Sequence, residues 1–166
     1  EGFKAGGPYF EKESALILAR SFLAMNDRPS GFVTFWGEPG RGKSHLLKGL
    51  VNGFRNVVVY AKYVVAADMI QSILEKYSDG NGNVAVEEAI QQYRNITVLA
   101  LDELDQVKET EWVLQTFHRL LNKRYEQNNM LTILAMKKSP DELSEDMDYL
   151  RSRMRGGNIL EVKGPD

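Results

Sequence analysis

The sequence has no cysteine and no long apolar run, and its 166 residues carry a formal net charge of only −2. Without cysteine, disulfide bonds and thiolate metal sites are excluded, which is consistent with a reducing compartment. No apolar stretch approaches the length of a membrane-spanning helix, and no signal-peptide pattern opens the chain. We therefore expect a cytoplasmic protein with no membrane partner.

Two further absences concern metals and nucleic acids. The two histidines, His45 and His118, lack the clustering that a zinc site needs. A net charge near zero gives no overall basic field for nucleic acid. Local basic clusters could still bind phosphate, although such clusters are more often solvated faces. These clusters are Arg119, Lys123 and Arg124; Lys137 and Lys138; and Arg151, Arg153 and Arg155.

The pattern of apolar residues predicts a single α/β domain with one buried core. Short runs that are apolar throughout predict strands at residues 32–36, 57–60, 96–101, 130–136 and 159–162. Helical spacing predicts helices near 12–25, after 44, and near 69–77, 84–93 and 110–127, with a loop at 78–83 and a short helix from Ser139. Apolar strands that alternate with helices indicate a parallel sheet covered on both faces. We expect a three-layer P-loop architecture with a five-stranded parallel sheet.

Residues 37–44, GEPGRGKS, match the phosphate-binding pattern G-x-x-x-x-G-K-[ST] without a mismatch. The pattern lies between an expected strand and an expected helix, which is the context that it needs. Its glycines let backbone N–H groups curl around a phosphate, and the helix N-terminus adds a favourable dipole. Lys43 would reach the β- and γ-phosphates, and the Ser44 hydroxyl would hold Mg²⁺. The sequence therefore predicts binding of a nucleoside triphosphate.

The third expected strand ends in acids, in the string Leu101-Asp102-Glu103-Leu104-Asp105. An acid at this point would lie opposite Ser44 across the phosphates, so we expect Asp102 to coordinate Mg²⁺. Glu103 would point to the other side and could orient and deprotonate an attacking water. The alternative is that Asp102 and Glu103 cap the next helix, and Asp105 could be either a cap or a supporting group.

Two features that are absent from the sequence argue against two classes of P-loop protein. A GTPase would show an Asn-Lys-x-Asp motif, but the nearest string, Asn122-Lys123-Arg124, lies in a predicted helix and lacks the acid. A small-molecule kinase would need an arginine-rich lid within the domain, and no such insertion is present. Hydrolysis of ATP is therefore favoured over phosphoryl transfer to a metabolite.

Three arginines, Arg151, Arg153 and Arg155, precede the last expected strand. An arginine far in sequence from its own P-loop can reach the γ-phosphate of a neighbouring subunit, where its planar fork stabilises transition-state charge. The alternative is a basic surface helix that only pairs with nearby acids, namely Glu142, Glu145 or Asp146. The spacing of the arginines supports these two interpretations equally.

With these motifs in order, the chain resembles AAA+ ATPases of the branch that holds DnaC/DnaI-type helicase loaders, DnaA-type replication initiators and IstB-type transposition ATPases. Residues 36–47, WGEPGRGKSHLL, resemble its Walker A region, and residues 93–104, YRNITVLALDEL, resemble its Walker B region. The string Ser152-Arg153-Met154-Arg155-Gly156 looks like the arginine-finger segment of the loaders, which favours Arg153 as the finger. The implied cofactors are ATP/ADP and Mg²⁺, with metal ligands Ser44 and Asp102. The implied nucleotide-binding residues are Glu38, Pro39, Gly40, Arg41, Gly42, Lys43, Ser44 and His45.

This branch carries extra helices after its second strand, and these line single-stranded DNA. The two helices expected between Asp68 and Tyr93 occupy that place. The resemblance therefore implies DNA near Lys62, Lys76 and residues 80–83. The alternative is that these helices only cover the sheet.

The chain departs from the family pattern in two ways. Where the branch usually has a short polar sensor of the γ-phosphate, alignment on Ser139-Pro140 places Lys137. A lysine could bond phosphate but would not polarise water as an amide does, so we expect slow hydrolysis or hydrolysis tuned by partners. The chain also begins with Glu1 and stops soon after the fifth expected strand. We expect residues 1–166 to be an AAA+ core fragment that lacks an N-terminal partner-docking domain and a helical lid.

The leading hypothesis is the ATPase core of a replicative helicase loader, which assembles on single-stranded DNA through an arginine finger in trans. Its partners would be the helicase, single-stranded DNA and other copies of itself. An IstB-like transposition helper would instead bind duplex DNA. A nucleotide-gated adaptor would bind ATP without turnover, and Lys137 would mark the lost activity.

Overall fold

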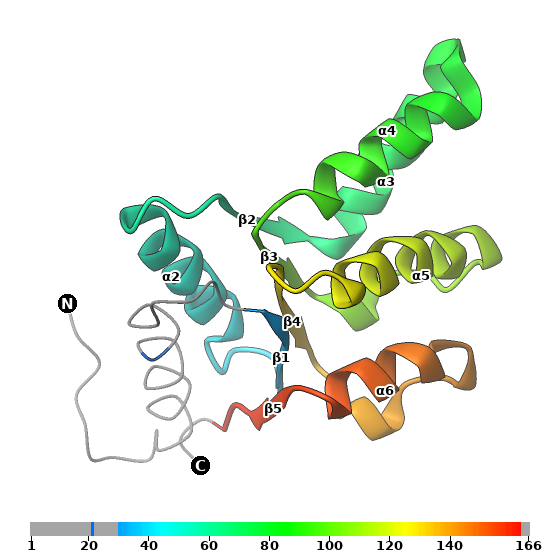
Figure 1. Cartoon of the computed structure of the whole chain (residues 1–166). Helices are drawn as coiled ribbons and strands as arrows, with labels where there is room; N and C mark the ends of the chain where they lie inside the picture. Colours follow the sequence, from blue (N-terminus) through cyan, green and yellow to red (C-terminus); the bar gives the residue numbers. More distant parts are fainter. Residues whose placement is uncertain (1–20, 22–29, 164–166) are drawn as a thin grey trace.

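Five parallel strands form one sheet in the computed structural model, which describes residue 21 and residues 30–163 of the chain (Figure 1). The strand order is β2-β3-β4-β1-β5, and every neighbouring pair is parallel. This arrangement confirms the predicted α/β fold with a five-stranded parallel sheet. The strands are β1 (Gly31–Trp36), β2 (Ala61–Val65), β3 (Val98–Asp102), β4 (Leu131–Met136) and β5 (Asn158–Glu161).

Helices cover both faces of the sheet, which gives the expected three layers (Figure 1). One face packs against α2 (Lys43–Asn56), and the other packs against α3 (Ala66–Lys76), α4 (Gly82–Arg94), α5 (Glu111–Glu126) and α6 (Asp148–Arg155). Short helical turns lie at Tyr77–Asn81, Leu104–Gln106, Pro140–Glu142 and Glu145–Met147. None of the helices in the described part of the chain has an apolar stretch sufficient to cross a bilayer.

Successive side chains of a strand point to opposite faces of the sheet, and helices cover both faces. The central strands are therefore apolar throughout. In β1, Val33 and Phe35 contact the core beneath α2, whereas Phe32 contacts the core beneath the other helices. All residues of β3 and β4 are buried, because both of their faces are covered. The carboxyl ends of β1, β3 and β4 therefore meet at one edge of the sheet, where ligands of such folds bind.

The second strand lies at Ala61–Val65, so its prediction at residues 57–60 was wrong. Helix α2 continues to Asn56, and the next three N–H groups turn back onto carbonyls of Phe54 and Arg55. Val58 has a φ of 61° and its side chain is 95% exposed. Valine favours strands because its side chain packs well on a half-buried sheet surface. Here the valines lie in an exposed turn, where that advantage is absent.

The predicted loop at residues 78–83 differs from the structure, and the predicted helix near 12–25 cannot be compared with it. The loop expected at residues 78–83 is partly helical, because a turn at Tyr77–Asn81 follows α3 directly and α4 begins at Gly82. Gly80 breaks this turn with a φ of 90°, a conformation that glycine adopts without a steric cost. The helix predicted near 12–25 lies outside the described residues, apart from Ser21.

Arg124 is fully buried, so it is not part of an exposed basic cluster, whereas Arg119 and Lys123 are exposed. It follows Leu120 and Leu121 at helical spacing on the face of α5 that packs on the sheet. Burial lowers its pKa from 12.5 to about 9, while hydrogen bonds to the charged form act in the opposite direction. The guanidinium donates to the carbonyls of Tyr93, Arg94, Ile96 and Leu131 and to the hydroxyl of Thr132.

Candidate functional site

A glycine-rich turn joins the end of β1 to the start of α2, as the sequence predicts. Gly40 and Gly42 have φ values of 78° and 89°, which are strained for other residues, and Gly42 directly precedes α2. The N–H of Gly37 donates to the carbonyl of Met136 at 3.2 Å, so the turn is anchored to the end of β4. The Lys43 ammonium donates to the carbonyls of Gly37 and Glu38 across the turn. The P-loop is therefore folded around its own lysine.

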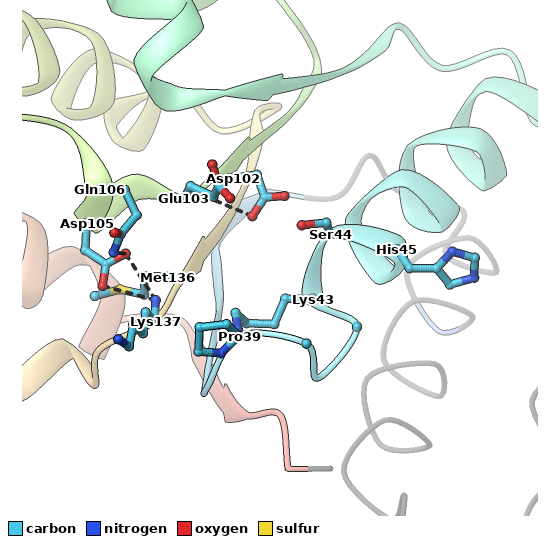
Figure 2. Close-up of a pocket in the computed structure, with 12 residues that line it drawn as sticks. Pro39, Lys43, Ser44, His45, Asp102, Glu103, Asp105, Gln106, Met136 and Lys137 are labelled. Carbon is cyan, nitrogen blue, oxygen red and sulfur yellow. Dashed lines mark hydrogen bonds between the residues drawn. The ribbon is translucent and has the colours of Figure 1, made fainter.

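A cavity of about 510 Å³ lies over the carboxyl ends of β1, β3 and β4 (Figure 2). Its floor is the P-loop and the first turn of α2, and its opposite wall follows β3 and β4. It is lined by Pro39, Gly40, Gly42, Lys43, Ser44, His45, Asp102, Glu103, Asp105, Gln106, Met136 and Lys137. Three segments that are far apart in sequence thus contribute to one site.

Asp102 closes β3 as a buried carboxylate with only 2% of its surface exposed. One of its oxygens accepts from the N–H of Glu103 at 2.9 Å, and the other accepts from the Tyr63 hydroxyl at 2.5 Å. Glu103 has a φ of 54°, which is uncommon outside glycine and is frequent at functional sites. Its side chain is exposed and makes no capping bond to the following turn. The alternative role of Glu103 as a helix cap therefore has no support.

Asp105 ties the end of β3 to the end of β4. Its carboxylate accepts from the N–H of Lys137 at 3.1 Å and from the N–H of Lys138 at 2.8 Å (Figure 2 shows the contact with Lys137). Gln106 donates from its amide to the same carboxylate at 3.3 Å. Asp105 is thus the supporting group that was one of its two predicted roles, and it fixes the backbone that carries Lys137.

Burial and nearby charges act in opposite directions on the pKa of Lys43. Burial lowers the pKa of the Lys43 ammonium, while the nearby carboxylates of Asp102, Asp105 and Glu38 raise it. The net direction is downward from 10.5. A cation that is only partly compensated at the base of a cavity is well suited to an anionic ligand.

The donor set at the cavity fits Mg²⁺ that is shared with bound phosphates. Ser44 and Asp102 offer a hydroxyl and a carboxylate, and Figure 2 shows these side chains pointing toward each other. Mg²⁺ prefers oxygen ligands and usually binds through one or two carboxylates together with substrate phosphates. The described residues hold no group of three or more His, Cys, Asp or Glu side chains that could bind a metal alone. The site is thus suited to a metal–nucleotide complex, and not to an independent metal centre.

Most of the predicted site residues meet at this cavity. Glu38 and Arg41 are not among its lining residues, although the carbonyl of Glu38 accepts from Lys43. Arg153 lies elsewhere, against Asn122 and Tyr125 of α5. The predicted residues that do line the cavity are Pro39, Gly40, Gly42, Lys43, Ser44, His45, Asp102, Glu103 and Lys137.

Sequence reasoning missed Tyr63 and Gln106. Gln106 follows directly on the acidic end of β3, so its proximity to that motif could have indicated it. Tyr63 comes from another strand, and its contact with Asp102 depends on the register of β2 against β3. No local pattern marks such a residue.

The sheet order and the P-loop at the end of β1 define the class of AAA+ P-loop ATPases. The family model described as Bacterial DnaA ATPase domain matches residues 11–161. This chain belongs to that family.

Three relatives illustrate the likeness. The chromosomal replication initiator protein DnaA of Corynebacterium jeikeium (strain K411) is 27% identical over 133 residues, which are 79% of this chain and 22% of that protein. A solved replication initiator DnaA bound to AMPPCP and single-stranded DNA superimposes with a TM-score of 0.82 at 24% identity, covering 98% of this chain and 49% of that one. The DnaC helicase loader superimposes with a TM-score of 0.72 at 21% identity, covering 97% of this chain and 94% of that one. The chain spans only about a fifth of the length of the Corynebacterium initiator.

Proposed function

We propose that this chain is the ATP-binding and ATP-hydrolysing core of a replicative helicase loader, which assembles on single-stranded DNA under nucleotide control. The observation that carries the proposal is the cavity where the P-loop, the end of β3 and the end of β4 meet. The likeness to DnaA and DnaC proteins supports a place in replication initiation. The loader assignment rests in addition on the segment of α6 that resembles the arginine-finger segment of loaders.

In this proposal the cavity binds ATP with its phosphates along the P-loop. Lys43 exchanges its contacts with the P-loop carbonyls for the β- and γ-phosphates, and the N-terminus of α2 adds a favourable dipole. Ser44 and Asp102 hold Mg²⁺, which neutralises phosphate charge when bound. Glu103 orients and deprotonates the attacking water. Lys137, which Asp105 fixes at the cavity wall, contacts the γ-phosphate.

Assembly is proposed to use Arg153 of one copy at the nucleotide of the next. Arg153 is not among the residues that line its own cavity, as expected of a finger that acts in trans. The DNA surface is proposed near Lys62 and Lys76. Lys62 is exposed, and its ammonium lies over the ring of Tyr93, 5.3 Å from the ring centroid. Lys76 is exposed at the end of α3.

A second candidate is a nucleotide-gated adaptor that binds ATP without turnover. The specific observation in its favour is Lys137, an exposed lysine at the cavity wall where the family usually has a short polar residue. An ammonium can contact phosphate, but it has no acceptor with which to orient a water. The two candidates differ in hydrolysis and agree on nucleotide binding.

The test compares two variants that affect different steps. Lys43→Ala should weaken binding of a fluorescent ATP analogue by at least tenfold and abolish hydrolysis, because the phosphates lose their main cation. Glu103→Gln should keep binding within about twofold but lower hydrolysis by 10²–10⁴-fold, the usual contribution of a general base. Lys123→Ala, which removes an exposed lysine of α5, is the control and should change neither quantity.

The same proteins are then titrated against a labelled single-stranded oligonucleotide, with anisotropy measured in ATP, in ADP and without nucleotide. The proposal expects binding that needs ATP, weakens with salt because phosphate contacts release counterions, and is lost in Lys43→Ala. If Lys43→Ala binds ATP as the unmodified chain does, the site is wrong. ATP binding with no hydrolysis on DNA in the presence of the helicase would favour the adaptor.

A further inference from the structure

Tyr63 contacts a carboxylate of the site, although no sequence motif indicates it. It lies in the middle of β2, which forms an edge of the sheet beside β3. Its hydroxyl donates to the Asp102 carboxylate at 2.5 Å. This distance falls in the range of hydrogen bonds between a hydroxyl and an ionised carboxylate, which are about twice as strong as neutral ones.

The register of the two strands produces this contact. Tyr63 lies opposite Ala100, and Val65 lies opposite Asp102, so Tyr63 and Asp102 are diagonal neighbours. Alternate residues of a strand share a face, which places both side chains on the α2 side of the sheet. The long side chain of tyrosine spans this diagonal and brings its hydroxyl to the carboxylate.

The contact satisfies a carboxylate that is otherwise costly to bury. Asp102 is almost completely removed from solvent, and a buried charge without partners destabilises a fold by several kcal/mol. One oxygen has the N–H of Glu103, and the other has the Tyr63 hydroxyl. Each oxygen therefore has one donor and keeps a lone pair that can bind a cation.

The tyrosine is itself held in place. Its ring packs against the core beneath α2, and the ammonium of Lys48 lies 5.0 Å from the ring centroid. Burial, together with the hydrogen bond and charge of Asp102, raises the pKa of Tyr63 to about 12.

We propose that Tyr63 is a positioning residue for the metal–nucleotide complex, because its hydroxyl holds the Asp102 carboxylate in one orientation beside Ser44. The proposal rests on the proposed function, since it assigns Asp102 and Ser44 to Mg²⁺. Groups that orient a metal ligand typically contribute 10–100-fold to metal affinity. Tyr63 acts through Asp102 and does not touch the nucleotide.

The test uses Mn²⁺ as the probe and does not depend on turnover. Mn²⁺ is titrated into the protein–ADP complex, and free Mn²⁺ is measured by electron paramagnetic resonance. Tyr63→Phe keeps the ring and removes only the hydroxyl, and it should weaken Mn²⁺ binding by 10–100-fold. The affinity for ADP in EDTA should change by less than about twofold. Tyr60→Phe, at a tyrosine that is 62% exposed just before β2, is the matched control and should alter neither value.

A second comparison separates positioning from packing. In an Asp102→Asn background, Tyr63→Phe should weaken Mn²⁺ binding no further, because the group on which Tyr63 acts is already changed. Equal Mn²⁺ affinity in Tyr63→Phe and the unmodified chain would overturn the role of Tyr63 and leave the nucleotide site intact. An equal loss of ADP affinity with and without metal would also overturn it. Failure of the unmodified chain to bind Mn²⁺ with ADP would overturn the proposed function, and the role of Tyr63 with it.

Discussion

The three arginines of α6 have different surroundings, although only one residue separates each from the next. Arg151 donates to the carbonyls of Pro140 and Leu143 and is mostly buried, so it holds the segment before α6 in place. Arg155 is exposed and pairs with Asp141. Arg153 lies with its guanidinium 4.3 Å from the ring centroid of Tyr125 and donates to Asn122 at 3.1 Å. Unlike its two neighbours, Arg153 forms no ion pair with a carboxylate among the described residues.

We expect a mixing experiment to separate Arg153 from its neighbours. Glu103→Gln subunits, which bind ATP without hydrolysing it, are added in excess to a small amount of unmodified chain on single-stranded DNA. If Arg153 acts in trans, adding Arg153→Ala to these subunits should lower hydrolysis per unmodified chain by roughly tenfold or more, because a finger contributes strongly to the transition state. The same addition of Arg155→Ala should have little effect. Equal phosphate release from both mixtures would exclude Arg153 as the finger.

At the scale of elements, the packing of β5 against β1 depends on two close approaches of backbone to backbone, one near each end of β5. A Cβ at Gly157 would lie 2.0 Å from the carbonyl oxygen of Phe32 in β1, and a Cβ at Gly37 would lie 2.5 Å from that of Val162. The N–H of Val162 also donates to the carbonyl of Trp36 at 2.7 Å. Strand β5 is therefore held against the residue at which the P-loop begins. Gly157, which follows the arginine segment, therefore has a packing role.

Gly157→Ala should therefore destabilise the fold, with Gly49→Ala as a matched control. The atom that a Cβ would meet at Gly157 is a backbone oxygen, which cannot move aside, so we expect a loss of about 1–3 kcal/mol in the free energy of unfolding. Gly49 is exposed in α2 with nothing within 4 Å of a Cβ, and alanine there should add about 0.5–1 kcal/mol. Urea unfolding measures both changes. Equal shifts in the two variants would contradict the close approach at Gly157.

Local motifs at the ends of the strands could be predicted from the sequence, but contacts that depend on strand boundaries could not. The P-loop and the acidic end of β3 are local strings, and their positions at the cavity follow once parallel strands share a carboxyl edge. The strand was expected at residues 57–60 because valines favour strands, but these valines lie in a turn and β2 begins at Ala61. That displacement matters for the site: Tyr63 reaches Asp102 only in the observed register of β2. Contacts set by strand register cannot be predicted before the strand boundaries are known.

At the scale of the whole molecule, the candidate site and the buried Arg124 lie at opposite ends of the strands. The carboxyl edge holds the cavity, with its strained backbone at Glu103 and its partly compensated charges. The amino edge holds Arg124, whose guanidinium joins the last turn of α4 to the start of β3 and β4. Periodicity placed Arg124 on a helix, but charge suggested that it was exposed. A buried cation can be recognised only when the backbone acceptors that surround it are known.

Arg124→Met should remove this connection while keeping an unbranched, though shorter, side chain on the buried face of α5. The carbonyls that it satisfies would remain buried without their donor, and each such group costs about 1–3 kcal/mol. Removal of the buried charge offsets part of this cost, so we expect a net loss of about 3 kcal/mol, which lowers the melting temperature by about 6–12 °C in a domain of this size. Lys123→Met, at the preceding exposed residue, should change stability by no more than about 0.5 kcal/mol. Calorimetry of both variants measures the difference.

Affinity for ATP, measured well below both transitions, should be unchanged, because Arg124 lies at the end of the strands opposite the cavity. Equal melting temperatures for the two variants would mean that the hydrogen bonds of Arg124 only compensate its own burial.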